Sequence, residues 1–170
     1  SPHVAAVAAT CLLDPRDWRA RAHMTRAGAL GVLGGPLSAL ARGGLARTMV
    51  PMSAVANLRR MSRNRALSHL CAVDPHGGAA RVPLGFLASY LRFAHTPPER
   101  NRTPVTLLHP GRDAWTPVEL SAGVLSRAAG PAELVVLREC GHFPVEDPGV
   151  TDLVDAVADL ARRLGSRGGD

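Results

Sequence analysis

Two apolar runs in the C-terminal part of the chain constrain the fold more than any other feature. The first, residues 103–109, is rich in β-branched and aliphatic side chains and stops at a Pro-Gly pair, which is a turn signal. The second, residues 133–137, shows no polar alternation, as expected for a strand that is covered on both faces. Asp113 follows the first predicted strand and His142 follows the second, so each strand is followed by a side chain suited to proton transfer.

The segment between these two runs is predicted to form one helix. Thr116 is predicted as its N-cap, Pro117 as its first helical residue and Glu119 as the partner that closes a capping box. Apolar residues follow at positions 120, 124 and 125, and a Gly-Pro pair ends the element. A strand, a helix and a second strand in this order predict a parallel crossover unit.

A third strand is predicted near the N-terminus. The run that starts at Val4 is small and apolar and leads into an Asp-Pro pair, so we expect a buried strand that leaves the sheet there. Asp14 and Asp17 suit turn-forming and N-capping roles, and a functional role for an acid at this place stays open. The sequence thus predicts a parallel sheet with helices on both faces and strands near 4–12, 103–109 and 132–138.

The long connection over residues 19–102 is predicted to be mostly helical. It exceeds a simple crossover, shows no second convincing strand, and is divided by glycines into short helices. Residues 55–62 and 66–73 have helical spacing, and a further helix carries one apolar face, formed by Val82, Phe86, Tyr90 and Phe93. That face is expected either to pack on the sheet or to line a pocket for an apolar substrate group.

The chain closes with a predicted amphipathic helix after Pro148. Its apolar residues recur at helical spacing, namely Val150, Leu153, Val154, Val157, Leu160 and Leu164. Arg162 and Arg163 suit the C-terminal end of this helix, and Gly165 suits its stop. Residues 166–170 are expected to form a disordered tail.

Composition argues against several classes of partner. The net charge is +6, but every basic residue is arginine and the arginines are dispersed without aromatic residues between them, so no nucleic-acid partner is expected. Three cysteines form no Cys-x-x-Cys pair, which favours a reducing, cytoplasmic setting. No apolar run is long enough to predict a membrane span.

The end of the chain resembles a known enzyme family. Leu-Leu-His-Pro-Gly-Arg-Asp-Ala-Trp-Thr-Pro, followed by Glu-Cys-Gly-His-Phe-Pro-Val-Glu, is similar to the C-terminal half of cap-bearing α/β-hydrolases of the esterase and lipase type. The resemblance implies an α/β class chain with a partial α/β-hydrolase fold, in which three parallel strands are flanked by helices. Residues 1–18 and 103–165 would form the core, residues 19–102 a helical cap inserted between strands, and residues 166–170 the tail.

The resemblance also implies a chemistry. The family's triad runs in the order nucleophile, acid, histidine, so Asp113 and His142 match the acid and the histidine. The implied substrate is a small apolar carboxylic ester, cleaved through an acyl-enzyme without cofactor or metal. Four aromatic residues are the expected substrate pocket: Phe86, Tyr90, Trp115 and Phe143.

The first member of the triad is missing from these residues. No Gly-x-Ser-x-Gly occurs, nor any glycine-flanked serine between a strand and a helix. We therefore expect a fragment, a truncated product or one piece of a split gene, inactive unless an N-terminal half is supplied. The expected partners are that separate half, or a second copy that pairs through an exposed sheet edge.

Several alternatives stay open at this point. An aspartate nucleophile with the same Asp/His pair would give a dehalogenase or epoxide hydrolase, and a non-catalytic chain would keep the fold as a binding module. Cys140 lies two residues before His142 and is a candidate thiol nucleophile, although it lacks the sharp strand-to-helix turn that such a group needs. Three other histidines, His69, His76 and His109, match no metal-ligand spacing.

Overall fold

The computed structural model describes residues 4–28, 33, 36 and 38–167, and these divide into two compact units. The sheet unit comprises Ser1–Leu13, Thr96–Asp113 and Pro117–Asp170, and the helical unit comprises Asp14–His95 and Ala114–Thr116. The chain thus leaves the sheet unit after Leu13, returns at Thr96, and leaves it again for three residues after Asp113.

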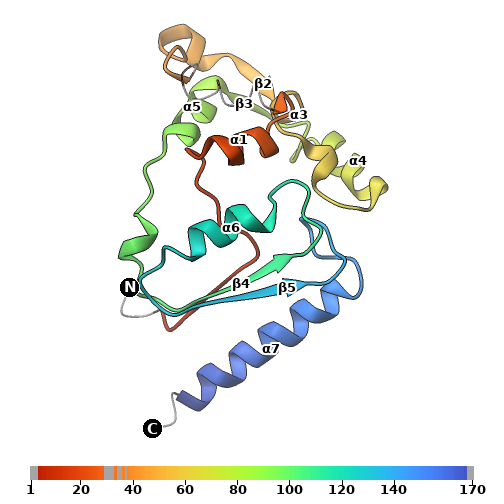
Figure 1. Cartoon of the computed structure of the whole chain (residues 1–170). Coiled ribbons are helices and arrows are strands. Elements are labelled where there is room, and N and C mark those ends of the chain that lie inside the picture. The colour runs from red at the N-terminus through yellow and green to blue at the C-terminus, as the bar shows by residue number, and fades with distance from the viewer. Residues whose placement is uncertain (1–3, 29–32, 34–35, 37, 168–170) are drawn as a thin grey trace. The chain divides into compact units, whose positions relative to one another are not determined.

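The sheet unit contains three parallel strands, as the sequence predicted, and their order in the sheet is β1-β4-β5. The three strands are β1 (Val7–Ala9), β4 (Val105–Pro110) and β5 (Ala132–Leu137). Strands β4 and β5 lie side by side in Figure 1. The register pairs Val7 with Val105 and Val105 with Ala132. All six residues of the central strand β4 are buried, because both of its edges and both of its faces are covered.

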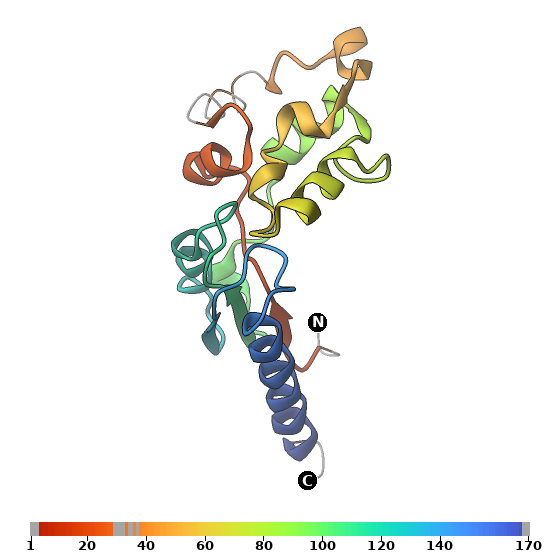
Figure 2. The same cartoon turned by 90° about the vertical axis from the view of Figure 1, so that its right-hand side faces the viewer.

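Helices α6 (Val118–Leu125) and α7 (Gly149–Arg167) cover opposite faces of this sheet (Figures 1 and 2). Alternate side chains of a strand point to opposite faces, so β4 supplies both layers of the core. Val105 and Leu107 pack with Leu125 of α6. Leu108 lies in a second cluster with Leu137 and Cys140, and Leu153 of α7 packs against it. A single-turn helix, η4 (Pro98–Arg100), precedes β4.

Both outer strands are more exposed than predicted. β1 is only three residues long and its Val7 is 38% exposed, whereas the sequence predicted a buried strand over 4–12. β5 was expected to be covered on both faces, but Leu134 and Val136 are exposed. The reason is that these strands lie at the two edges of the sheet. Each face of the sheet is covered by a single helix, which leaves part of the outer strands exposed.

Two helix ends also differ from the prediction. Helix α6 begins at Val118 with Pro117 as its N-cap and has no side-chain capping bond, so Thr116 is not the N-cap. Thr116 is buried and belongs to the helical unit. Helix α7 continues through Gly165 to Arg167, which places Ser166 in a helix; residues 168–170 of the expected tail lie outside the described part. Val154 and Val157, expected on the packed face of α7, are exposed.

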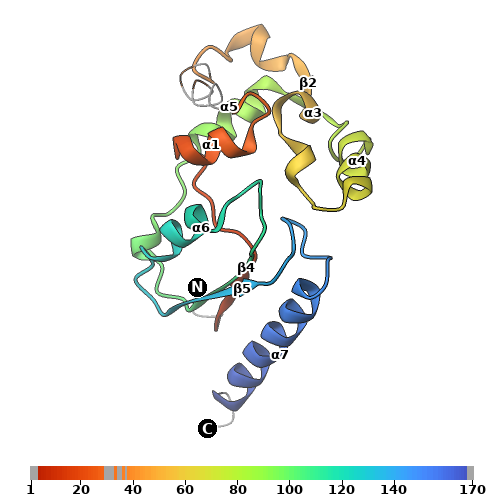
Figure 3. The same ribbon diagram turned by 45° about the vertical axis from the view of Figure 1, so that its right-hand side comes forward.

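The helical unit contains short helices (Figure 3) and a small second sheet, whose strands β2 and β3 are labelled in Figure 1. Its elements are α1 (Trp18–Met24), η2 (Gly43–Arg47), β2 (Met49–Pro51), α3 (Met52–Val55), η3 (Leu58–Arg60), α4 (Arg65–Val73), β3 (Arg81–Pro83) and α5 (Leu84–Arg92). The antiparallel pair β2-β3 shows that the expectation of no strand within 19–102 was wrong. The helix predicted over 66–73 is present, whereas residues 55–62 form only the end of α3 and the turn η3.

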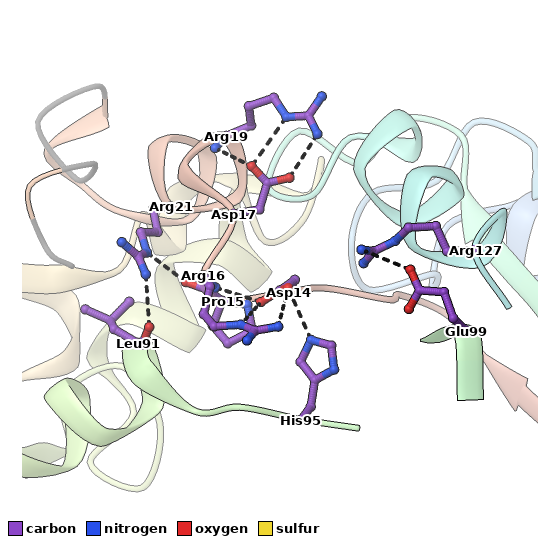
Figure 4. Close-up of polar contacts among 10 residues, drawn as sticks. All are labelled: Asp14, Pro15, Arg16, Asp17, Arg19, Arg21, Leu91, His95, Glu99 and Arg127. Carbon is purple, nitrogen blue, oxygen red and sulfur yellow. Dashed lines mark hydrogen bonds and ion pairs between the residues drawn. The ribbon is translucent and has the colours of Figure 1, made fainter. Parts of the chain in front are cut away.

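The two ends of the 14–95 segment are tied together by polar contacts (Figure 4). The carboxylate of Asp14 pairs with the guanidinium of Arg16 at 3.0 Å and lies 3.3 Å from Nε2 of His95. Arg21 donates from Nε to the carbonyl of Pro15 at 2.7 Å and from Nη2 to that of Leu91 at 2.9 Å. α1 therefore lies beside the end of α5, and the entry and exit of the segment are held side by side.

The turn and capping roles predicted for the first two acids are confirmed. Asp14 accepts from the backbone N–H of Arg16 at 2.9 Å, which closes a turn. Asp17 is the N-cap of α1 and accepts from the N–H of Arg19 at 2.9 Å. Among the described residues, no helix is both long enough and apolar enough to cross a bilayer.

Candidate active site

The turn after β4 is bonded to the end of β5 by the backbone. The N–H of Gly111 donates to the carbonyl of Leu137 at 2.7 Å, and the N–H of Arg112 donates to that of Cys140 at 3.0 Å. A Cβ atom built on Gly111 would lie 2.8 Å from the carbonyl oxygen of Leu137, which is closer than real side chains come. Glycine is therefore needed at this position so that the two loops can meet.

Asp113 and His142 face each other from these two loops. Nδ1 of His142 lies 2.8 Å from Oδ2 of Asp113, and the expected contact is therefore present. The Asp113 side chain is fully buried and that of His142 is 16% exposed. An ionised carboxylate only accepts hydrogen bonds, so Nδ1 carries the proton and Nε2 of a neutral ring is the nitrogen able to take one. The geometry suits a histidine held by a carboxylate as a general base.

The loop that carries His142 is held by a hydrogen bond within the loop and by an ion pair to the loop of Asp113. Glu146 accepts from the N–H of Gly141 at 3.1 Å, and the guanidinium of Arg112 pairs with Glu139 at 3.0 Å across the two loops. Glu139 itself has a positive φ of 52°, a conformation that non-glycine residues adopt rarely. The ring of Phe143 lies 5.7 Å from the ring of His142, centroid to centroid.

Cys140 is a poor candidate for a nucleophile. Its side chain is fully buried in the core cluster of Leu108 and Leu137, and its Sγ lies 3.7 Å from the carbonyl of Leu137. Burial raises the pKa of this thiol, which disfavours the thiolate that would attack a substrate. The structure thus argues for a packing role of Cys140.

His109 is a buried histidine within the sheet unit. Its Nδ1 lies 3.0 Å from the carbonyl of Pro110, and its Nε2 makes no hydrogen bond within the described part of the chain. Burial lowers the pKa of His109, so the ring is held neutral. No group of three or more metal-ligating side chains is found among the described residues.

Three of the four predicted pocket residues meet in the helical unit. Phe86, Tyr90 and Trp115 line one cavity of about 230 Å³. Phe143 belongs to the sheet unit and lies beside His142 instead. The sequence prediction missed Met24 and Met52, which also line the cavity. In the sequence, Ala20 and Met24 are apolar residues four positions apart, a spacing that places both on one helix face and that could have found Met24. Both are buried in α1.

Comparison with known proteins rests on structure alone, because no known protein family and no characterised protein matches the sequence. One similar solved structure is the Paleococcus ferrophilus monoacylglycerol lipase, with a TM-score of 0.55 and 19% identity over 77% of this chain. Another is DcsB in complex with its substrate analogue, with a TM-score of 0.55 and 16% identity over 96% of this chain.

The chain has a partial α/β-hydrolase fold. The matches cover 51% of the lipase and 58% of DcsB, so the chain spans little more than half of either protein. In open α/β sheets the reactive groups lie at the carboxyl ends of the strands. Asp113 and His142 occupy this position after β4 and β5, which makes their pair the candidate active site of the α/β-hydrolase fold in this chain.

Proposed function

We propose that this chain supplies the acid and the histidine of a hydrolase that cleaves carboxylic esters through an acyl-enzyme. The observation that supports the proposal is the 2.8 Å contact between Nδ1 of His142 and the buried carboxylate of Asp113. The sequence contains no Gly-x-Ser-x-Gly motif, so the proposal assigns the nucleophile to polypeptide outside the 170 residues.

In the proposed reaction, Nε2 of His142 takes the proton of a serine hydroxyl as its oxygen attacks the ester carbonyl. The Asp113 carboxylate holds the ring in the required tautomer and stabilises the imidazolium that forms. The proton then passes to the leaving alcohol, and the ester C–O bond breaks. Water then gives a proton to Nε2 of His142 as its oxygen attacks the acyl carbon. The bond between that carbon and the serine oxygen breaks, the serine oxygen takes the proton back from His142, and the carboxylic acid leaves.

The test compares the chain alone with a longer product that includes the coding sequence directly upstream. The longer product is expected to hydrolyse p-nitrophenyl butyrate, and the chain alone is expected to match the uncatalysed background. Asp113→Asn in the longer product should lower kcat by about 10⁴-fold, because an amide can fix the wrong tautomer. Glu119→Gln, which removes a carboxylate in the first turn of α6, is the matched control and should leave kcat unchanged.

Two results would contradict the proposal. One is turnover by the longer product that survives His142→Ala, because the histidine would then have no part in the chemistry. The other is an upstream product that binds the chain and hydrolyses no ester at all. An NMR signal from the Nδ1 proton of His142, present in the parent chain and lost in Asp113→Ala, would separately verify the geometry.

A further inference from the structure

The cavity in the helical unit is built from segments distant in sequence. Met24 comes from the end of α1, Met52 and Val55 from α3, and Phe86 and Leu91 from α5. Trp115 joins them from the three-residue segment that belongs to this unit. Four separate segments therefore line the cavity, so the cavity forms only when the helical unit is folded.

The cavity is too large to be a packing defect. Protein interiors leave few voids larger than a water molecule. An apolar cavity of about 150 Å³ is already enough to bind benzene. This cavity measures about 230 Å³, and two of its lining residues, Phe86 and Tyr90, are 56% and 41% exposed, so it opens to solvent.

The polar groups at its wall are already engaged. Nε1 of Trp115 donates to the carbonyl of Met24 at 3.1 Å, which leaves the indole ring for apolar contact. The hydroxyl of Thr25 is directed to the carbonyl of Gly28 at 3.4 Å. The guanidinium of Arg21 on α1 is bound to the carbonyls of Pro15 and Leu91. No charged side chain is among the described residues that line the cavity.

We propose that this cavity binds an uncharged aliphatic or aryl group of a small molecule. Scaling from benzene in about 150 Å³, the space accommodates roughly six to nine carbon atoms. The binding rests on the helical unit alone and does not require the proposed ester hydrolysis.

Tryptophan fluorescence tests the proposal directly, because Trp115 lines the cavity and the chain has one other tryptophan, Trp18. Trp18 is 60% exposed on α1, and Trp18→Phe leaves Trp115 as the single reporter. Titration with 1-butanol, 1-hexanol, 1-octanol and 1-dodecanol should give a saturable change. Affinity should rise about fourfold per methylene group up to the length that fills the cavity, and then stop rising.

A pair of matched variants makes the result specific. Ala56 lines the cavity, and Ala56→Leu should weaken 1-hexanol binding at least tenfold while far-UV circular dichroism stays unchanged. Ala66→Leu adds the same volume on the exposed side of α4 and should bind like the parent. Leu87→Phe is the second filling variant, should Ala56→Leu fail to fold.

The proposal is overturned by either of two outcomes. The first is the absence of a saturable Trp115 signal with every alcohol up to its solubility limit. The second is equal affinity of the Ala56→Leu and Ala66→Leu variants, since the alcohol would then bind elsewhere. The experiment measures alcohol binding and not ester hydrolysis. A negative result would therefore contradict the cavity proposal and leave the proposed ester hydrolysis to its own test.

Discussion

At the scale of single residues, the candidate site depends on a position that carries no side chain. Gly111 lets the turn after β4 approach the carbonyl of Leu137, and this contact brings the loop of Asp113 against the loop of His142. The carboxylate and the imidazole supply the chemistry, but the backbone sets their separation. A change at Gly111 is therefore expected to disturb the pair without touching either member.

Gly111→Ala is predicted to lower the free energy of unfolding by about 1–3 kcal/mol, the usual range for overpacking. The added Cβ would meet the backbone oxygen of Leu137 at 2.8 Å, and backbone cannot move aside cheaply. Urea denaturation measures the effect. Gly123→Ala is the control: it lies inside α6 with nothing within 4 Å, and should stabilise the chain by about 0.5–1 kcal/mol. Equal effects of the two changes would contradict this account.

At the scale of elements, the Asp14 cluster joins the two ends of the segment that forms most of the helical unit. Burial opposes ionisation of Asp14, but the hydrogen bonds and charge of Arg16 outweigh it and lower the pKa of the carboxyl to about 2. The charge of His95 acts in the same direction. Both partners face the carboxylate in Figure 4.

Asp14→Asn is predicted to destabilise the protein by about 1–2 kcal/mol at pH 7. The carboxyl has a lower pKa in the folded chain, about 2, than the ordinary value of 3.8. Its stabilising effect is therefore complete above the ordinary value and is lost as the pH falls toward 2. The difference in unfolding free energy between parent and variant, measured from pH 7 to pH 2, should shrink as the pH falls below 3.8 and should be mostly lost near pH 2.

Asp155→Asn on the exposed side of α7 is the matched control for the Asp14 experiment. It removes one negative charge without removing a described ion pair, and should change stability by less than about 0.5 kcal/mol. A constant difference between parent and Asp14→Asn over the whole pH range would show that the effect is one of packing.

At the scale of the whole molecule, the sheet unit leaves apolar surface open. β1 ends the sheet order, and Val4 and Val7 are 44% and 38% exposed. On α7, Val154 and Val157 are exposed as well. An edge strand with exposed apolar side chains is a template for pairing with another chain. We therefore propose that a partner pairs at the β1 edge, either a second copy or a separate half of the fold.

The chain alone is predicted to self-associate with increasing concentration, as measured by size-exclusion chromatography with light scattering. Val7→Lys should reduce the association, because a charged side chain at a sheet edge discourages strand pairing. Val73→Lys makes the same change at a 51% exposed site on α4 and should leave association as in the parent. A monomer at every concentration, or equal suppression by both variants, would refute the role of the β1 edge.

The parallel sheet could be predicted from the sequence, because strand and turn signals are local, whereas the pairing of Asp113 with His142 was an expectation from the resemblance to α/β-hydrolases. An apolar run followed by Pro-Gly marks a strand end, and parallel strands bring their carboxyl ends to one edge. The strand pair β2-β3 could not be predicted, because three-residue strands show no period and pair with residues 30 to 34 positions away. The exposure of β1 and β5 could not be predicted either. The apolar residues of a strand do not show whether a helix covers that strand in the folded chain.

The sequence by itself determined which residues are available for proton transfer and after which strand each of them comes. Only the tertiary structure decided which groups meet. It placed Cys140 in the core, where burial raises the pKa of its thiol, and brought Trp115 to the cavity with Phe86 and Tyr90 while Phe143 lies beside His142. The physical reason is that burial and close approach arise from packing between distant segments, whereas strand and turn signals lie within a few neighbouring residues.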